Sequence, residues 1–145
     1  MSFFHKTISV APNTAEAEPQ IDMIDIQSGV VHRVHISIPS GHAGLTGVRV
    51  LRGLHQIAPT SASEWFQGDD MELDYQEYVE ISDAPFELTI ESFNLDDTYT
   101  HTFRVGIGVL PEWVLVPQLM LRDIMTGVSE ILGGITRYIG MRKEA

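Results

Sequence analysis

The stretch SGHAGLTG, from Ser40 to Gly47, has three evenly spaced glycines and a histidine, a composition that could hold a phosphate group. Loops that bind phosphate converge backbone N–H groups and the start of a helix on the anion. Here strand-like runs lie on both sides and no lysine follows the last glycine, so the phosphate-loop and dinucleotide-binding contexts are missing. We interpret the stretch as a turn between two strands, in which glycines adopt positive φ angles and His42 is replaceable without loss of chemistry.

Six histidines could bind a metal ion or transfer protons, and two of them, His32 and His35, have a spacing found in metal-ligand pairs. Side chains three apart on a strand point to opposite faces, so this pair could not chelate one ion without a bulge. His101 falls on the apolar face of its expected strand, where we expect a hydrogen-bonded core histidine. The histidine pattern therefore favours structural roles over a metal site.

The paired aspartates Asp69 and Asp70 follow Gly68 and could act as metal ligands or as an acid–base pair. Glycine and aspartate are also typical turn residues, and we interpret Gly68–Asp70 as a turn that leads into the next strand. Two alternatives remain open. One is a calcium site that uses Asp69, Asp70 and either Asp96 or Asp97; the other is a catalytic carboxylate pair.

The remaining residue types favour a protein that is not an enzyme and holds no cofactor. The chain has no cysteine, which excludes a disulfide framework, a thiolate nucleophile and a zinc–thiolate site. No flanking motif supports a Ser/His/Asp triad, so a small hydrolase is the least favoured interpretation. An aromatic sugar-binding face is an open alternative, formed by Trp65, Phe66, Phe93, Tyr99 and Trp113.

The charge distribution argues against nucleic acid and membranes as partners. The net charge is −11, and the segment between Arg52 and Arg104 holds acidic residues throughout but no lysine or arginine. Such a surface repels phosphate backbones and anionic lipids. The sequence has no run of about 18 apolar residues, and its start lacks the cationic and apolar regions of a signal peptide.

Short β-strands with alternating apolar and polar residues are predicted over 30–38, 47–57, 71–81, 85–93 and 99–110. We expect a bend or bulge at Gly53. The pattern indicates a mainly β fold, an antiparallel β-sandwich or jelly-roll-like domain over residues 21–116. Before it, residues 1–20 are expected to form a short edge strand and then an extended N-terminal arm, Ala11–Gln20, whose order depends on a partner.

After Pro111 the spacing of apolar residues changes, which predicts a C-terminal amphipathic α-helix within residues 117–145, from about Gln118 to Met141. Its apolar residues follow a heptad seam: Leu121, Ile124, Val128, Ile131, Ile135 and Tyr138. Two arrangements are open, because the helix could fold back over its own sandwich or pair with copies of itself. Closed cyclic symmetry with three copies would satisfy the second arrangement.

Two turns and the strands beside them resemble those of a known family. IPSGHAGLTGVRV (Ile38–Val50) and WFQGDDMELDY (Trp65–Tyr75) together resemble small structural proteins of tailed bacteriophages, over about Ile38 to Trp113. The resemblance implies a β-sandwich or jelly-roll protein that decorates or connects parts of the particle. It supplies no catalytic residues, and the C-terminal helix lies outside it.

These observations lead us to expect a non-enzymatic protein of the virion, a capsid decoration or cementing subunit. Its partners would be copies of itself and other virion proteins such as the major capsid protein. Contacts are expected from Phe3 and Phe4 in the arm and from the helix seam. The alternatives are a tail, neck or baseplate component, and a carbohydrate- or host-surface-binding sandwich, with or without calcium.

Overall fold

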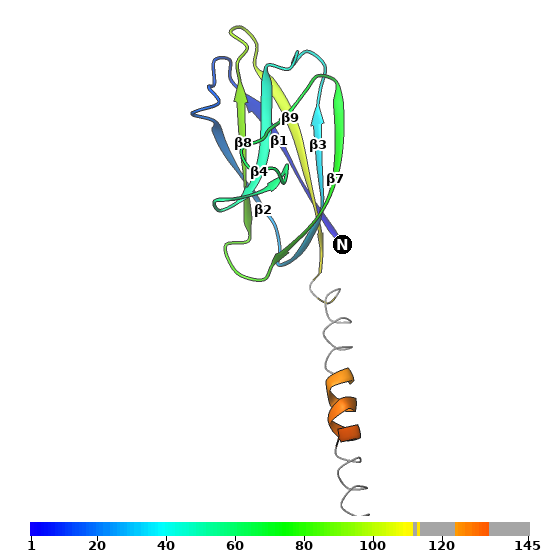
Figure 1. The fold of residues 1–145 in the computed structure, drawn as a ribbon. Coiled ribbons are helices and arrows are strands. Elements are labelled where there is room, and N and C mark those ends of the chain that lie inside the picture. The colour runs from blue at the N-terminus through cyan, green and yellow to red at the C-terminus, as the bar shows by residue number, and fades with distance from the viewer. Residues whose placement is uncertain (112, 114–123, 134–145) are drawn as a thin grey trace, which may run out of the picture. The chain divides into compact units, whose positions relative to one another are not determined.

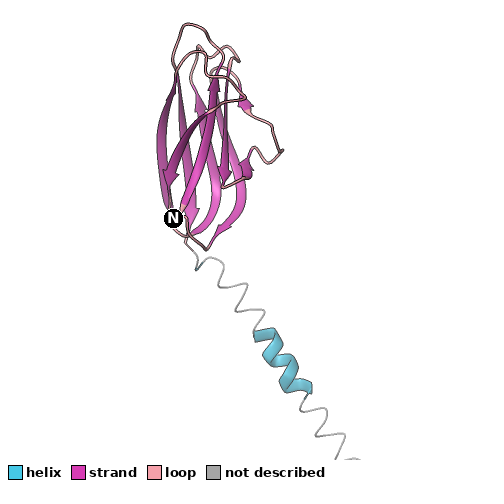
Figure 2. Ribbon diagram, turned by 90° about the vertical axis from the view of Figure 1, so that its left-hand side faces the viewer, coloured by secondary structure: helices cyan, strands magenta, loops and turns pink. Residues whose placement is uncertain are grey.

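A computed structural model describes residues 1–111, 113 and 124–133. The chain divides into two compact units, Met1–Pro111 and Glu112–Ala145. The first is built from β-strands in two antiparallel sheets, and the second holds a helix (Figure 1, Figure 2). The mainly β, antiparallel fold that the alternation of apolar residues predicts is therefore confirmed.

The first sheet has the strand order β1-β9-β3-β7, and each strand runs antiparallel to its neighbours. Its strands are β1 (Ser2–Val10), β9 (His101–Leu110), β3 (Gly29–Ile38) and β7 (Met71–Ile81). The second sheet has the order β2-β8-β4-β5, with the short β6 also paired to β4. Its strands are β2 (Gln20–Asp25), β8 (Glu87–Asn94), β4 (Thr46–Arg52), β5 (His55–Ala58) and β6 (Phe66–Gln67).

One hydrophobic core fills the space between the two sheets. On each strand every second residue points inward, so apolar side chains from both sheets meet there. Fully buried members include Val34, Ile36, Phe103, Val105 and Ile107 from the first sheet, and Val48, Val50, Leu88 and Ile90 from the second. Burial of each large apolar side chain contributes about 1.5–3 kcal/mol to the stability of the fold. This determines which side of each strand faces the core.

The N-terminal residues belong to the first unit, and the extended arm that the sequence predicts is not confirmed. β1 is an edge strand, as expected, and pairs with β9 along its whole length. Beyond it, Thr14 and Asn94 exchange two backbone hydrogen bonds of 2.8 and 2.9 Å. The prediction of an arm rests on the lack of apolar periodicity in Ala11–Gln20. Within this range, the backbone of Thr14 pairs with the end of β8, and Asn13 N–H donates to the carbonyl of Asp96.

Gly53 lies in a hairpin turn rather than in a bend within one strand. The sequence predicts a single strand over 47–57, but β4 ends at Arg52 and β5 begins at His55, directly opposite it. Gly53 has a φ of 57°, which glycine adopts without steric strain. Leu54, beside it in the turn, is fully exposed.

The second unit contains a helix over residues 124–133. This helix falls inside the predicted range, Gln118 to Met141. The remainder of that range lies outside the described residues, and with it Leu121, Ile135 and Tyr138 of the predicted seam. No helix in the described part of the chain is long and apolar enough to cross a membrane.

Two glycines leave room for aromatic rings on the outer faces of the sheets. A Cβ atom at Gly47 of β4 would overlap the ring of Phe93, which is buried and meets Trp65 edge-on at a centroid distance of 4.9 Å. A Cβ atom at Gly106 of β9 would overlap the ring of Phe3, which is 50% exposed. The Phe93 ring is thus enclosed, whereas the Phe3 ring has solvent beside it.

We expect Gly47→Ala to lower the free energy of unfolding by about 2 kcal/mol, because the enclosed Phe93 ring cannot move away from the added methyl group. Gly106→Ala is the matched control and should lower it by less than about 1 kcal/mol, since Phe3 can rotate into solvent. Urea unfolding followed by tryptophan fluorescence measures both. Equal losses would show that enclosure of the Phe93 ring does not determine the difference.

Candidate functional site

Four connections of the sandwich meet at one end of the first unit, which we call the loop end (Figure 1). It comprises residues 11–19, 39–45, 68–70 and 95–100. Backbone hydrogen bonds join these loops: Leu95 N–H donates to the carbonyl of Leu45 at 2.9 Å, and Asn13 N–H to that of Asp96 at 2.8 Å. The stretch SGHAGLTG connects β3 to β4, so its interpretation as a turn between two strands is confirmed.

Asn94, the last residue of β8, is the central hydrogen-bonding residue of the loop end, and it is fully buried. Its Nδ2 donates to the carbonyl oxygens of Val10 at 3.1 Å and Tyr99 at 2.8 Å. Its Oδ1 accepts from the backbone N–H of Asp96 at 3.0 Å. Together with the backbone pairing to Thr14, one residue ties β1, the β1–β2 loop and the β8–β9 loop together, with both amide hydrogens used.

His42 is buried in the loop end, although it lies in a glycine-rich turn, and it is only 2% exposed. Its Nδ1 lies 2.6 Å from the Thr46 hydroxyl, and the ring also hydrogen-bonds to the backbone of Thr102. The ring centroid is 4.5 Å from that of His101 and 5.0 Å from that of Phe103. Burial, and after it the neighbouring His101, lower the pKa of His42, so its neutral form is favoured.

His101 lies beside His42 and pairs with Asp96. Its Nε2 is 2.9 Å from Asp96 Oδ2, and Asp96 Oδ1 accepts from the backbone N–H groups of Thr98 and Tyr99 at 2.8 and 3.0 Å. The hydrogen bond from His101, followed by the two backbone donors, lowers the pKa of Asp96 to about 2. The expectation of a hydrogen-bonded core histidine at position 101 is therefore confirmed.

Asp69 fastens the β6–β7 turn to the glycine-rich loop. Its Oδ1 accepts the backbone N–H groups of Gly41 and His42 at 2.7 and 2.8 Å. Hydrogen bonds from the backbone, Ala43 first and then Gly41 and His42, hold the pKa of Asp69 below its usual range. Asp70 has a φ of 50°, a conformation typical of turns, so the interpretation of this segment as a turn is confirmed.

The described residues do not assemble the metal site that the sequence left open. Within residues 1–111, 113 and 124–133, no group of three or more histidine, aspartate or glutamate side chains could hold an ion. Asp69 is directed at the backbone of the β3–β4 loop, and Asp96 is directed at His101. Two of the carboxylates considered as calcium ligands therefore bind different groups of the protein and do not point toward a common site.

A hydroxyl, two imidazoles and a carboxylate follow one another in the loop end, on Thr46, His42, His101 and Asp96. These types could form a nucleophile with its base, but Thr46 has no exposed surface in the described chain. The cluster instead satisfies polar groups that burial would otherwise leave unpaired. We assign it a structural role, which is to fix how the four loops meet.

β3 contains a bulge that places His32 and His35 on the same outer face of the first sheet. The register of β3 shifts between Val31 and Arg33. A Cβ atom at Gly108 of β9, which would point outward, would meet the His32 ring. Regular alternation predicts opposite faces for the two histidines. This prediction is wrong, because the bulge inserts one extra residue into β3 and so reverses the direction in which the residues after it point.

Carboxylates of β7 bind the outward side chains of β3. Arg33 donates two hydrogen bonds of 2.6 Å to Asp74, which lowers the pKa of Asp74 and raises that of Arg33. His35 Nε2 lies 2.8 Å from one Glu72 oxygen, and the other accepts from the Ser37 hydroxyl at 2.7 Å. Part of the negative charge of the acidic segment is thereby balanced within the sheet.

The aromatic residues considered as a sugar-binding face belong largely to the packing of the sandwich. Phe93 is buried with Trp65 edge-on against it, and Phe66 packs against the core. Tyr99 and Trp113 are 67% and 68% exposed, but they belong to different units. The Phe93 ring, enclosed in this way, has no open face on which a sugar could stack.

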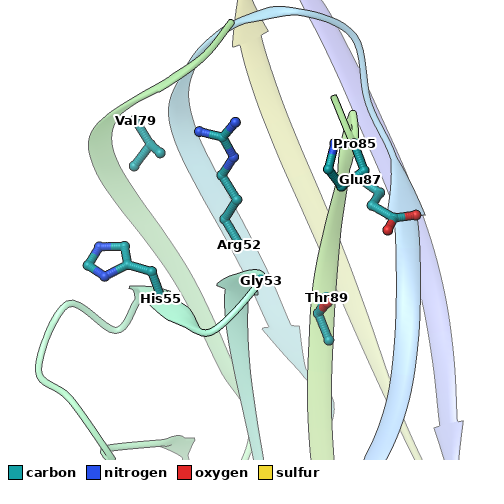
Figure 3. A pocket seen from close by; sticks show the side chains of 7 residues that line it. All are labelled: Arg52, Gly53, His55, Val79, Pro85, Glu87 and Thr89. Carbon is teal, nitrogen blue, oxygen red and sulfur yellow. The ribbon is translucent and has the colours of Figure 1, made fainter. Parts of the chain in front are cut away.

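A pocket of about 460 Å³ opens beyond the β4–β5 turn, with β7 on one side and β8 on the other (Figure 3). It is lined by Arg52, Gly53, His55, Val79, Pro85, Glu87 and Thr89. The pocket could not be predicted from the sequence, because its residues come from separate segments with no shared motif. The one signal in the sequence is Arg52, the last cation before the acidic segment.

No protein-family model matches the chain, and a comparison with curated proteins found no match. The resemblance of the two turns to phage structural proteins therefore stays a prediction. The geometry of the described residues carries the functional argument.

We expect the protein to lose stability through His42 as the pH falls from about 7 to about 5. The unfolded chain has an ordinary histidine pKa of about 6.5, whereas the pKa of His42 in the fold is lower. Above about pH 6.5 His42 is neutral in both the folded and the unfolded state, so its full contribution to the free energy of unfolding is present. Below it, the unfolded state binds a proton that the folded state does not, so the free energy of unfolding falls.

Urea unfolding at several pH values across this range measures the slope. His42→Gln, which keeps a donor and an acceptor but does not titrate, should show a shallower slope than the wild type. Ile36→Val is the control, because it should lower the free energy of unfolding by a similar amount at every pH. A His42→Gln slope equal to that of the wild type would refute the role of this imidazole.

Proposed function

We propose that the protein is a non-enzymatic structural component of a tailed-bacteriophage particle, a capsid decoration or cementing subunit with a jelly-roll-type body. It assembles as a closed homo-oligomer, with three copies as the first expectation, and contacts the major capsid protein in the virion. Support comes from the resemblance of Ile38–Val50 and Trp65–Tyr75, and from the two-sheet body. The observation that carries the proposal is the apolar seam of the helix.

The helix of residues 124–133 has an apolar seam that is open to solvent. Ile124, Val128 and Ile131 are 61%, 50% and 65% exposed, and they are spaced by four and three residues. This spacing places them on one side of the helix, as in helices that pair along a coiled coil. Burial of a large apolar side chain contributes about 1.5–3 kcal/mol, so the seam favours association with copies that carry the same seam.

The heptad spacing continues in the sequence on both sides of this helix, at Leu121, Ile135 and Tyr138, which lie outside the described residues. The polar residues Ser129 and Glu130 fall off the seam. When copies of the chain pack around a rotation axis, the apolar seam of each helix is buried against the seams of the others, and no seam stays exposed. This is the reason for proposing a closed oligomer rather than a chain of subunits.

The outer face of β1 offers a second contact region, on the sandwich itself. Phe3 is half-exposed and lies over Gly106, whereas Phe4 packs against the core. Of the two residues expected as contacts, Phe3 therefore stays in the proposal as an assembly contact. Phe4 contributes to the fold.

We expect Val128→Asp to reduce the assembled mass to that of one 16.2 kDa protomer, because a carboxylate in the seam cannot be buried between helices without loss of its hydration. Ser129→Asp is the matched control: it adds the same charge one residue away, off the seam, and should assemble like the wild type. Light scattering after size-exclusion chromatography measures the mass, and circular dichroism verifies the fold.

A chain that ends after Pro117 should also be folded and monomeric. The proposed interface is wrong if the wild type is a monomer, or if either Val128→Asp or the shortened chain assembles normally.

A separate experiment tests the location in the virion. From a phage-producing culture of the source strain, density-gradient centrifugation separates DNA-filled particles from free protein. An antiserum against the sandwich should detect the chain in the particles, and immunogold should label the capsid surface. Label on the neck, tail or baseplate would move the protein to that part of the particle, and recovery only among free proteins would exclude a virion component.

A further inference from the structure

The strand β7 forms one margin of the first sheet, and its outer edge is long and open (Figure 1). It runs for 11 residues, Met71–Ile81, contains no proline, and has β3 as its partner strand. Among the residues that the structure describes, no backbone-to-backbone hydrogen bond outside this pairing comes from Glu72–Tyr78. An edge of this kind presents N–H and C=O groups to which another strand can bind.

The other edges of the two sheets are bridged or short. At the opposite margin, Lys6 Nζ of β1 donates to the carbonyl of Met23 on β2 at 2.6 Å. Gln20 Nε2 of β2 donates to the carbonyl of Ser9 on β1 at 3.2 Å. The edge strand β5 has four residues, and Pro59 follows it directly. In the described part of the chain, β7 is therefore the long edge whose backbone is left open over most of its length.

Arg52 shows which backbone groups of β7 point toward the open edge. Its Nη1 reaches across from the second sheet and donates to the carbonyl of Glu80 at 2.9 Å. In an antiparallel sheet, the backbone groups of every second residue point to the same edge. Four further residues of β7 share this direction, and their side chains are all exposed: Glu72, Asp74, Gln76 and Tyr78. The half-buried residues between them bond to β3.

The side chains of β7 determine the charge of a suitable partner. The strand carries four acidic residues and no lysine, arginine or histidine. Arg33 balances Asp74, whereas Glu77 and Glu80 take part in none of the ion pairs found among the described residues. Tyr78 is 65% exposed and offers an aromatic face to a cation. A second copy of β7 would place like charges opposite each other, which is destabilising.

We propose that β7 binds an extended basic segment of a partner protein, which adds to the first sheet as a fifth strand. The segment alternates basic side chains, beside the exposed residues of β7, with apolar ones beside the half-buried Leu73, Tyr75 and Val79. Backbone hydrogen bonds supply affinity in strand addition, and the alternating side chains supply specificity. The assembly proposed above does not use this edge, since Phe3 lies on β1 at the opposite margin of the sheet.

Isothermal titration calorimetry of the intact protein with synthetic peptides tests the proposal. The probe is KVRVKVR with both ends blocked. Two controls keep its composition and charge: KKVVVRR lacks the alternation, and KVRVKVR methylated on the backbone nitrogen of each basic residue lacks the N–H groups that would bond to β7. We expect a Kd of about 100 μM or tighter for the probe, and at least about tenfold weaker binding for each control. No binding of the probe, or equal binding of either control, would overturn the proposal.

Amide hydrogen exchange, measured by NMR on the intact protein, locates the bound peptide. Exchange at Asp74, Gln76 and Tyr78 should slow when the probe binds. Leu73 and Tyr75, which bond to β3, should exchange slowly with and without it. Slowing at another edge would contradict the assignment to β7. If exchange at Asp74 and Gln76 already slows in the free protein as its concentration rises, a second copy occupies the edge and the proposal is wrong.

Gln76→Pro tests the backbone of the edge. It removes one N–H from the open side without removing a bond to β3, and proline is tolerated in an edge strand where its nitrogen faces solvent. The variant should bind the probe at least about tenfold more weakly, because the ring also blocks close approach of the added strand. Circular dichroism verifies its fold. Full binding by folded Gln76→Pro would exclude strand addition.

Gln76→Lys tests the charge of the edge and leaves the backbone unchanged. It places a cation beside the basic residues of the probe and should weaken binding at least about fivefold. Thr7→Lys is the matched control, because Thr7 is exposed on β1 at the opposite margin and gains the same charge. It should bind like the wild type. If both variants weaken binding equally, general charge attraction explains the binding and the assignment to β7 is wrong.

Discussion

The buried carboxamide of Asn94 is the interaction on which the arrangement of the loop end depends. Strand pairing fixes β1, β8 and β9 along their lengths, but it does not decide how the loops beyond them meet. Asn94 does, because its side chain bonds to the end of β1 and to the β8–β9 loop while its backbone holds Thr14. The ring of His42 can then be buried beneath a glycine-rich turn that Asp69 holds from the other side.

The two polar regions of the sandwich differ in how far the fold satisfies them. In the loop end, the Asp96 carboxylate has His101 and two backbone donors, and the His42 ring has Thr46, so hydrogen bonds offset the cost of removing these groups from water. In the pocket beyond the β4–β5 turn, the Arg52 guanidinium is oriented by two backbone carbonyls and takes part in none of the ion pairs found among the described residues. Because its polar groups have partners within the fold, the loop end is assigned a structural role.

The sequence could predict what depends on neighbours along the chain. Period-two alternation locates four strands closely, with 30–38, 71–81, 85–93 and 99–110 predicted for β3, β7, β8 and β9. The same alternation places His101 inward. It could not show that Ala11–Gln20 pairs with the end of β8, that His42 is enclosed by residues of β9, or that Arg52 meets the loop after β7, because each depends on contacts between distant segments. The bulge at His32 has no local signature, and one added residue reverses the facing of the strand.

The pairing of β1 with β9 gives the sandwich a polarity. Ser2 lies opposite Val109, so the chain enters and leaves the body at one pole, and Val10 lies opposite His101 at the other, where the loops are. The two poles are separated by the length of a strand, roughly 30 Å for ten residues. Loop sequences can therefore diversify without altering the pole at which the chain is joined to its next segment. The loop end and the pole that carries both ends of the body are thus built from different residues.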